Sequence, residues 1–506
     1  MTVLFDNLQG LLPFASLAYL VFLAVILLVY YSLPTATLRT MWLLIVSSLF
    51  FLLYSPSYLW VIGFVTACSF ISGLMLERIT DARFRKWILK VSVFGLLATL
   101  VVFKYMHLGT ELAGGFYGVN NNGGTSLVFN VLLPVGISFW VLQAIAYVVD
   151  VFRDESPPIT NLLTFASSIV FFPILVMGPI TPIASLAPQL SKKQKFSPQN
   201  IQSGFLLIGW GFFKKLVIAD RLAVFVNQVF ENPYAYSGRV NGSIFLIAAL
   251  FFAVQIYADF SGYTDIVRGS ARTMGFTLPL NFEAPYFARS VSDFWRRWHM
   301  SLMAWLKKYI YIPLGGNRVG ARWKYLNVML TFAVSGLWHG VGLSYLAWGL
   351  LNGFYIVVGD MLASQKRNLQ ERFNIRNDTF AYRLFQTVAV IALITVAWVF
   401  FRANSLSQAL YILPRMLIPT PWVLTDGSLL NQGLSQGEIT IALVATVLVW
   451  CIDWKKRSDH TGIQTWFRTQ PLWFRWALYF SLILSILLLG HFGLAYQASD
   501  FIYFQF

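Results

Sequence analysis

Runs of about 20 apolar residues recur along the chain, and they constrain its fold more than any other feature. A helix of that length crosses the ~30 Å hydrocarbon core of a bilayer. The runs lack the two-residue alternation of membrane β-barrel strands, and a bilayer admits only helices or closed barrels. The sequence therefore predicts an all-α polytopic membrane protein with about 11–13 transmembrane or re-entrant helices.

The composition supports this class, since 57% of the residues are hydrophobic and only 11% are charged. Soluble domains carry roughly 25% charged residues. No repeat or soluble domain interrupts the pattern, so one membrane domain over residues 1–506 is predicted. The expected spans are 14–33, 40–54, 57–76, 86–104, 128–150, 161–180, 201–220, 242–260, 326–358 (one broken helix or two short ones), 384–401, 436–453 and 472–496.

The net charge of +16 comes from 37 basic and 21 acidic residues. The basic residues gather in short loops between apolar runs, which is the positive-inside pattern of a membrane protein, so we exclude nucleic acid as a partner and expect contact with membrane lipids. Cys68 and Cys451 both lie in apolar segments. Two isolated cysteines exclude a disulfide framework and a thiolate metal site, and no metal is predicted.

The loop charges also predict an orientation in the membrane. The 77–91 loop is basic, and residues 265–325 hold ten basic and three acidic residues, so both are predicted to be cytoplasmic. The 105–127 connection is rich in Gly and Asn and is predicted to be external. Counting spans from these loops places both termini outside. The topology of 160–240 stays open.

Two histidines stand out in the region 255–345. His339 lies in the apolar run around Gly336-Leu337-Trp338, where an ionisable residue is costly and is by default a functional candidate. A buried neutral imidazole can act as a general base that removes a hydroxyl proton, and the alternative is a structural histidine bonded within the bundle. No G-x-S-x-G motif is present, which favours direct transfer over a covalent serine intermediate.

His299 follows the basic and aromatic block 294–298. We expect it on an interfacial helix at a basic surface, either as a second essential residue or as a bystander. Asp293 is expected to N-cap that helix. Asp265 is expected to pair with an arginine in a structural role.

Four arginines could bind the phosphate groups of a ligand, because guanidinium groups bind phosphate in a bidentate manner. The alternative is that they determine topology and extend toward lipid headgroups. These four are Arg268, Arg272, Arg296 and Arg297.

Five motifs resemble the signature of the membrane-bound O-acyltransferases, in the bacterial branch of alginate and peptidoglycan O-acetyltransferases and of the D-alanyl transfer protein of teichoic acid. They are DFSGYTDI (259–266), DFWRRWHMSL (293–302), YIYIPLGGNR (309–318), SGLWHG (335–340) and the final FIYFQF (501–506). The chain departs from the family pattern at Lys307-Lys308, where an Arg-Asp pair is expected.

The resemblance implies an enzyme of the bacterial inner membrane that passes acetyl groups from cytoplasmic acetyl-CoA to an extracytoplasmic polysaccharide such as alginate, peptidoglycan or cellulose. It implies catalytic roles for His339 and His299, an SGNH-type periplasmic partner and no tightly bound cofactor. Tyr503 is the tail hydroxyl that could carry the acetyl group, and the alternative is an interfacial anchor.

Two other classes of function are compatible with polar residues inside a membrane. Polar residues inside the membrane are also typical of secondary transporters, but no inverted halves are visible and intramembrane carboxylates are scarce in the sequence. A haem protein would use His299, His339 or His491 as axial ligands, yet the spaced histidine pairs of a bundle cytochrome are lacking.

Overall fold

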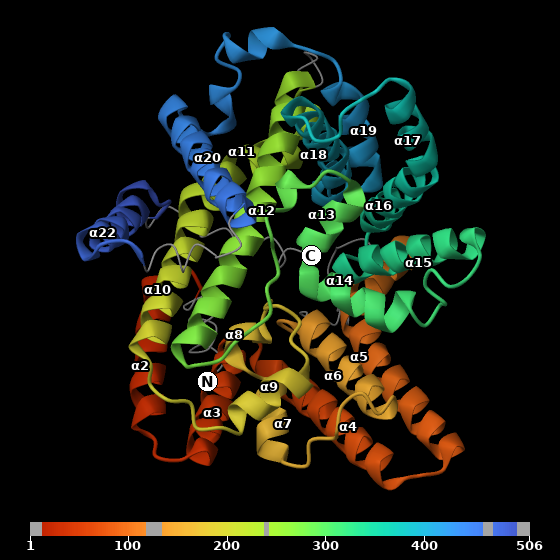
Figure 1. Cartoon of the computed structure of the whole chain (residues 1–506), viewed down its shortest axis with the longest axis vertical. Helices are drawn as coiled ribbons and strands as arrows, with labels where there is room; N and C mark the ends of the chain where they lie inside the picture. Colours follow the sequence, from red (N-terminus) through yellow and green to blue (C-terminus); the bar gives the residue numbers. More distant parts are fainter. Residues whose placement is uncertain (1–12, 118–133, 237–241, 459–468, 493–506) are drawn as a thin grey trace. The chain divides into compact units, whose positions relative to one another are not determined.

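The computed structural model describes residues 13–117, 134–236, 242–458 and 469–492, and every regular element in those ranges is helical (Figure 1). Eight helices are long and apolar enough to cross a membrane, or nine if one bent pair forms a single span. Two shorter apolar helices are α2 (Leu17–Ser32) and α6 (Ile137–Phe152). The predicted all-α polytopic class is confirmed.

Contacts within the chain divide it into two compact units. The first comprises residues 1–205 and 267–279, and the second comprises residues 206–266 and 280–506. The prediction of a single domain over residues 1–506 stays a prediction.

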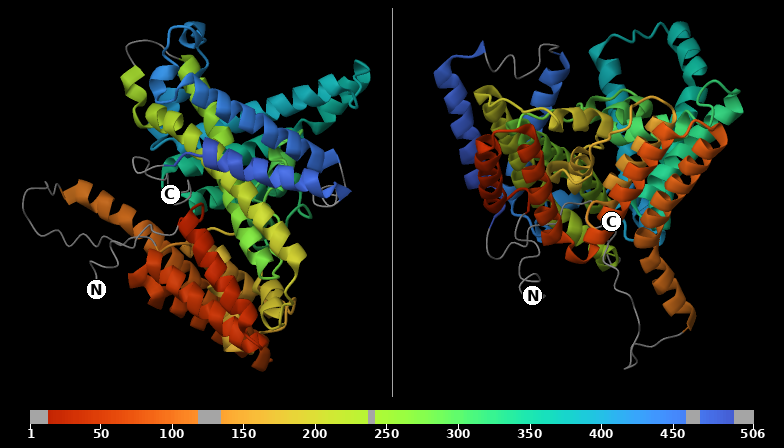
Figure 2. Two further views of the ribbon diagram at one scale, coloured as in Figure 1. Left: turned by 90° about the vertical axis from the view of Figure 1, so that its left-hand side faces the viewer. Right: turned by 90° about the horizontal axis from the view of Figure 1, so that it is seen from below.

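In the first unit, α4, α5 and α6 lie side by side (Figures 1 and 2). The predicted span 161–180 is not one helix there, because the chain breaks near Pro173, whose nitrogen cannot donate a helical hydrogen bond. The remaining helices of this unit are α3 (Ala36–Tyr54), α4 (Leu59–Arg78), α5 (Ala82–Tyr117), α7 (Leu162–Ile169), α8 (Phe172–Leu175) and α9 (Ile183–Leu190).

The second unit contains both candidate histidines. α10 (Pro198–Phe212) begins in the first unit and ends in the second. α12 (Gly242–Thr273) begins in the second unit, and its last residues, from 267 on, belong to the first. The other elements of the second unit are η2 (Phe213–Ala219), α11 (Asp220–Glu231), α13 (Val291–Arg297), α14 (Met300–Leu306), η5 (Lys307–Tyr311), α15 (Ala321–His339), α16 (Leu343–Met361), α17 (Ala363–Arg372), α18 (Phe380–Arg402), α19 (Leu406–Met416), α20 (Gln436–Ser458) and α22 (Leu472–Leu489).

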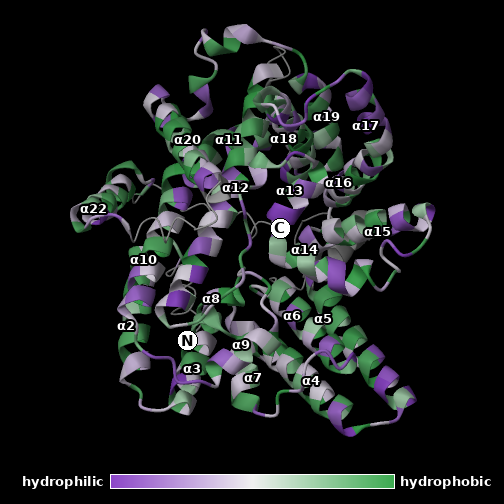
Figure 3. Ribbon diagram, in the orientation of Figure 1, coloured by the Kyte–Doolittle hydropathy of each residue, from purple (hydrophilic) through white to green (hydrophobic). Residues whose placement is uncertain are grey.

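The predicted break in the 326–358 run is present, since α15 ends at His339 and α16 begins at Leu343. Extended backbone at Gly340 separates the two helices. They pack closely against each other and, with α13 and α18, surround an aromatic core that includes Trp298, Trp348 and Trp398. The following α17 is mostly hydrophilic (Figure 3), so the apolar region ends near Met361.

Candidate functional site

His299 occupies the break between α13 and α14. Its φ of 45° and ψ of 50° lie in the left-handed region, which non-glycine residues adopt only where the surroundings hold them. The expected position at a basic surface is wrong, because the side chain is completely buried. The histidine therefore lies inside the helical core, directly after a basic turn.

Asn281 holds His299 in this conformation. Its Oδ1 lies 3.1 Å from His299 Nδ1 and accepts hydrogen bonds from the backbone N–H and the hydroxyl of Ser301 at 3.2 and 2.9 Å. The backbone N–H of Met300 also donates to the Asn281 carbonyl at 3.0 Å. Because the Ser301 N–H requires an acceptor at Oδ1, the contact with His299 is a donation from Nδ1–H, and the lone pair of the neutral ring lies on Nε2.

The N-cap of α13 differs from the expected one. Ser290, not Asp293, is the N-cap, and its hydroxyl accepts from the Asp293 backbone N–H at 3.0 Å. The Asp293 carboxylate accepts in return from the Arg289 N–H at 3.2 Å and binds Arg297 Nε at 3.0 Å. Asp293 thus supports the N-terminus of the helix from its first turn, by bonding the residue before the N-cap.

His339 is the last residue of α15 and only 4% of its surface is exposed. Its Nδ1 lies 2.7 Å from the carbonyl oxygen of Ser335, one turn earlier. A carbonyl can only accept, so Nδ1 carries the proton and Nε2 of the neutral ring carries the lone pair. The helix itself therefore selects the tautomer that a general base needs.

The two histidine rings lie next to each other, with centroids 6.4 Å apart and planes at 80°. Trp338 contacts both rings, at 6.1 Å from His299 and 4.8 Å from His339. Burial lowers the pKa of His299 well below its usual range, and the neighbouring His339 lowers it further. His299 is therefore neutral at physiological pH.

An aromatic cage surrounds His339, and we define it as Trp295, Trp348, Trp398 and Phe401. The Trp348 ring lies 4.8 Å and the Phe401 ring 5.6 Å from the imidazole. Trp348 also stacks on Trp398 at 5.9 Å and meets Trp295 edge-on at 5.6 Å. Such a cage removes water from the base and strengthens polar interactions made inside it.

Two glycines let α16 approach α15 closely enough to form this cage. A Cβ at Gly336 would overlap the Tyr345 carbonyl oxygen, and a Cβ at Gly349 would overlap the Phe332 carbonyl oxygen. Both obstacles are backbone atoms, which cannot turn aside as a flexible side chain can. The distance between the helices, and with it the position of Trp348 on His339, depends on these two residues.

We expect Gly336→Ala to lower the stability of the folded protein by about 1–3 kcal/mol, because the added methyl group pushes α16 away from α15. Thermal unfolding in detergent measures this change. The matched control is Gly359→Ala on α16, where a Cβ meets no atom within 4 Å and helix propensity favours alanine. Equal stability of the two variants would show that the close approach is not required.

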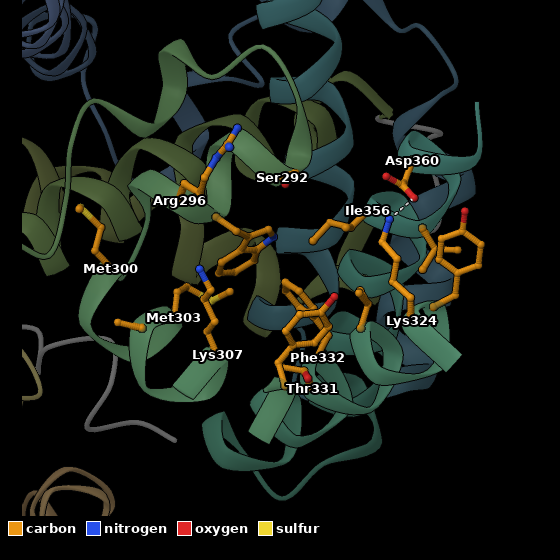
Figure 4. A pocket seen from close by; sticks show the side chains of 16 residues that line it. Ser292, Arg296, Met300, Met303, Lys307, Lys324, Thr331, Phe332, Ile356 and Asp360 are labelled. Atoms are coloured by element: carbon orange, nitrogen blue, oxygen red, sulfur yellow. Dashed lines mark hydrogen bonds and ion pairs between the residues drawn. The ribbon is translucent and has the colours of Figure 1, made fainter. Parts of the chain in front are cut away.

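A pocket of about 450 Å³ opens between α13, α14, α15 and α16 (Figure 4). Its floor is apolar and includes Trp295 and Phe332. Three basic residues lie around it, Arg296, Lys307 and Lys324, and the last forms an ion pair of 2.6 Å with Asp360. The remaining lining residues are Ser292, Met300, Met303, Ala304, Tyr311, Tyr325, Val328, Thr331, Ile356 and Val357.

One face of α15 connects the pocket lining with His339. Thr331, Ser335 and His339 are spaced by four residues, so they lie above one another at a rise of about 6 Å per step. Thr331 lines the pocket, so this lining residue lies roughly 12 Å along the helix from His339. Trp295 lines the pocket and belongs to the aromatic cage, and so joins the two sites.

The four predicted phosphate-binding arginines do not share one position. Arg296 lines the pocket and its side chain is 72% exposed, whereas Arg297 binds Asp293 and does not line the pocket. Arg268 and Arg272 lie near the end of α12, in the part of that helix that belongs to the first unit.

Sequence reasoning missed Lys307 and Lys324 as pocket residues, although the departure at Lys307-Lys308 was a signal for the first of them. Tyr503 lies outside the described residues.

Sequence reasoning also missed a cluster of buried charges between η2 and α12. Lys214 binds Asp265 at 2.6 Å, which replaces the arginine expected for that aspartate. Lys215 lies 2.8 Å from Asp220 and 2.7 Å from Asp259, and all three side chains are at most 5% exposed. Carboxylates are therefore less scarce inside the helical core than the sequence suggested.

Among the described residues, no group of three or more His, Cys, Asp and Glu side chains could hold a metal ion.

Comparison with known proteins gives consistent matches. The model of the MBOAT, or membrane-bound O-acyltransferase, family matches residues 118–406. The chain is 32% identical over 445 residues to a probable alginate O-acetylase of Pseudomonas putida, which covers 86% of this chain and 85% of the relative. It is 31% identical over 407 residues to a peptidoglycan O-acetyltransferase of Helicobacter pylori, covering 74% and 73%. A teichoic acid D-alanyltransferase of Bacillus subtilis is 26% identical over 235 residues, covering 44% and 57%.

Proposed function

The chain belongs to the membrane-bound O-acyltransferase family, and we propose that it takes acetyl groups from acetyl-CoA for the O-acetylation of an extracytoplasmic polysaccharide. It is a polytopic membrane protein and an O-acyltransferase. The observation that carries the proposal is the pair of adjacent buried histidines, which share α15 and Trp295 and its neighbours with a pocket lined by basic residues.

The pocket suits the donor. Arg296, Lys307 and Lys324 offer positive charge for the phosphates of coenzyme A, while the apolar floor suits the uncharged arm that carries the thioester. A volume of about 450 Å³ lies within the range of ligand pockets, ~300–1,000 Å³. In this arrangement the nucleotide part of coenzyme A would lie at the opening of the pocket, beside the basic residues. All three basic residues belong to the region 265–325, which the positive-inside pattern predicts to be cytoplasmic, the compartment that holds acetyl-CoA.

The histidines suit the reaction. Nε2 of His339 carries the lone pair that would remove the hydroxyl proton of the acceptor as the new ester bond forms. The departing thiolate of coenzyme A then takes that proton, which returns His339 to its neutral form. His299, held by Asn281 in the same tautomer, would orient the thioester or the acceptor beside it.

The acceptor polymer follows by analogy with the relatives, whose names specify alginate and peptidoglycan. We place the enzyme in the bacterial inner membrane with its C-terminus outside, where an SGNH-type partner would complete the transfer to the polymer. Tyr503 would receive the acetyl group and hold it for that partner.

Incubation of purified protein in proteoliposomes with labelled acetyl-CoA tests the donor. The proposal requires the label to leave coenzyme A and to appear on the partner or the glycan in an ester bond. Label that stays on coenzyme A in the presence of partner and glycan would exclude acetyl-CoA as the donor. The alanine variant of the base is the control for transfer that does not depend on this site.

Replacement of Tyr503 by phenylalanine tests the tail. If Tyr503 carries the acetyl group, the variant should lose glycan acetylation, because phenylalanine keeps the ring and removes only the nucleophilic oxygen. The matched control is Phe504→Ala, which alters an aromatic anchor and leaves the hydroxyl in place. Full acetylation by Tyr503→Phe would reduce the residue to an anchor at the membrane interface.

A further inference from the structure

Two polar groups beside His339 are buried without a hydrogen-bond partner among the described residues. They are the hydroxyl of Ser335 and the indole N–H of Trp348. Ser335 is 0% and Trp348 is 1% exposed. Buried donors are nearly always paired in folded proteins, and a donor that is not paired calls for an explanation such as a catalytic role.

Comparable groups in the same part of the fold are satisfied. The hydroxyl of Thr331, one turn before Ser335 on α15, donates to the Asn327 carbonyl at 2.7 Å in the usual way of a helical hydroxyl. The indole of Trp295, which packs against Trp348, donates to Asn352 Oδ1 at 3.2 Å. The packing of these helices therefore allows such bonds. Among the described residues the indole N–H of Trp398 is also unpartnered, but its ring lies behind Trp348, whereas Ser335 and Trp348 both contact His339.

Both groups are held against the base by rigid elements. The Ser335 carbonyl accepts the His339 Nδ1–H bond, so this residue lies one helical turn before the histidine on the same face of α15. The Trp348 ring meets the imidazole at 4.8 Å and 70°. The close approach at Gly336 and Gly349 fixes α16, and hence Trp348, against α15.

We propose that Trp348 Nε1–H and Ser335 Oγ–H form the oxyanion hole of this acyltransferase. The inference rests on the proposed function, because it concerns the transition state of acetyl transfer at His339. Donors fixed in a site without water, and aimed at the oxygen on which negative charge develops, are among the largest contributions to catalysis of acyl transfer. Donors without a partner in the free enzyme need not break a bond before they act.

The reaction is balanced around these groups. The acceptor hydroxyl oxygen attacks the thioester carbonyl carbon while its proton moves to His339 Nε2, and the electron pair of the C=O double bond moves to the carbonyl oxygen. That oxyanion accepts hydrogen bonds from Trp348 and Ser335. When the C=O bond re-forms, the C–S bond breaks, and the thiolate takes the proton from His339.

The test replaces Trp348 by 3-benzothienylalanine, in which sulfur takes the place of the indole N–H and the shape is kept. We expect kcat to fall by roughly 10²- to 10³-fold, as for the loss of one oxyanion donor, with KM for acetyl-CoA changed less than about threefold. The same replacement at Trp323, which is 62% exposed near the start of α15 and outside the cage and the pocket, is the control and should keep the wild-type kcat. A Trp348 variant that keeps kcat within twofold, beside active wild-type enzyme, overturns the assignment of the oxyanion hole and leaves the donor and the base untouched.

Ser335→Ala provides a second, independent test should the Trp348 variant fail to fold. It removes one hydroxyl from a helix that alanine favours, so any loss is not due to a weaker helix. A fall in kcat of more than tenfold at unchanged KM supports the proposal, and an unchanged kcat contradicts it. If wild-type enzyme with partner and glycan does not use acetyl-CoA at all, the proposed function fails, and the oxyanion hole for that donor fails with it.

Discussion

Replacement of His339 by alanine is expected to lower the rate of acetyl transfer by roughly 10²- to 10⁴-fold, which is the usual contribution of a general base. Nδ1 of this histidine is occupied by the Ser335 carbonyl, so Nε2 is the atom that can accept the hydroxyl proton. The measurement is the initial rate of label transfer from acetyl-CoA per amount of folded enzyme. Size-exclusion chromatography in detergent reports folding, because the side chain packs within the aromatic cage.

Two further variants separate a base from a packing residue. His339→Gln keeps a polar side chain of similar size and should be as inactive as the alanine variant, since an amide is not a base at neutral pH. His299→Gln should remain folded and retain more activity, because the amide can still hydrogen-bond to Asn281. A folded His339→Ala enzyme with near-normal transfer would show that another group takes the proton.

The fold class could be predicted from the sequence because the length of an apolar run is a local property. The broken run at 326–358 was also predictable, since three glycines at 336, 340 and 342 interrupt it. The short helices around Pro173 and the π-helical turn η2 were not predicted. Such breaks depend on which backbone groups find partners elsewhere in the fold, and hydropathy carries no information on that.

The two histidines were found because each is a polar residue among aromatic and apolar ones. Their proximity could not be predicted, since 40 residues separate His299 from His339. The burial of His299 was missed because the turn before it is basic, and arginines such as Arg296 can reach the surface while the backbone of the next residues turns inward. The pocket residue Lys324 was missed for a different reason. Only the packing of the folded chain brings α15 beside α13 and α14.

The ion pairs of Lys215 were missed because the sequence shows two lysines in an apolar run but not which carboxylates, on α11 and α12, they contact. Replacement of this lysine by methionine is expected to lower stability by roughly 3–5 kcal/mol. The lysine Nζ lies between Asp220 and Asp259, whose side chains are 1% and 3% exposed. Without the lysine charge, two carboxylates would share a region of low dielectric, where their repulsion is poorly screened. Thermal unfolding in detergent and the amount of protein that accumulates in membranes measure the effect.

The matched control is Lys324→Met, which also removes one lysine from an ion pair of similar length. Lys324 and Asp360 lie 2.6 Å apart, but their side chains are 32% and 45% exposed, so the loss should stay below about 1 kcal/mol. Adding Asp220→Asn and Asp259→Asn to Lys215→Met should restore part of the stability, because the two negative charges are then removed as well. If Lys215→Met alone were as stable as the control, the carboxylates would have to be protonated in the folded protein. The cluster would then be a hydrogen-bonded group without net ion pairing.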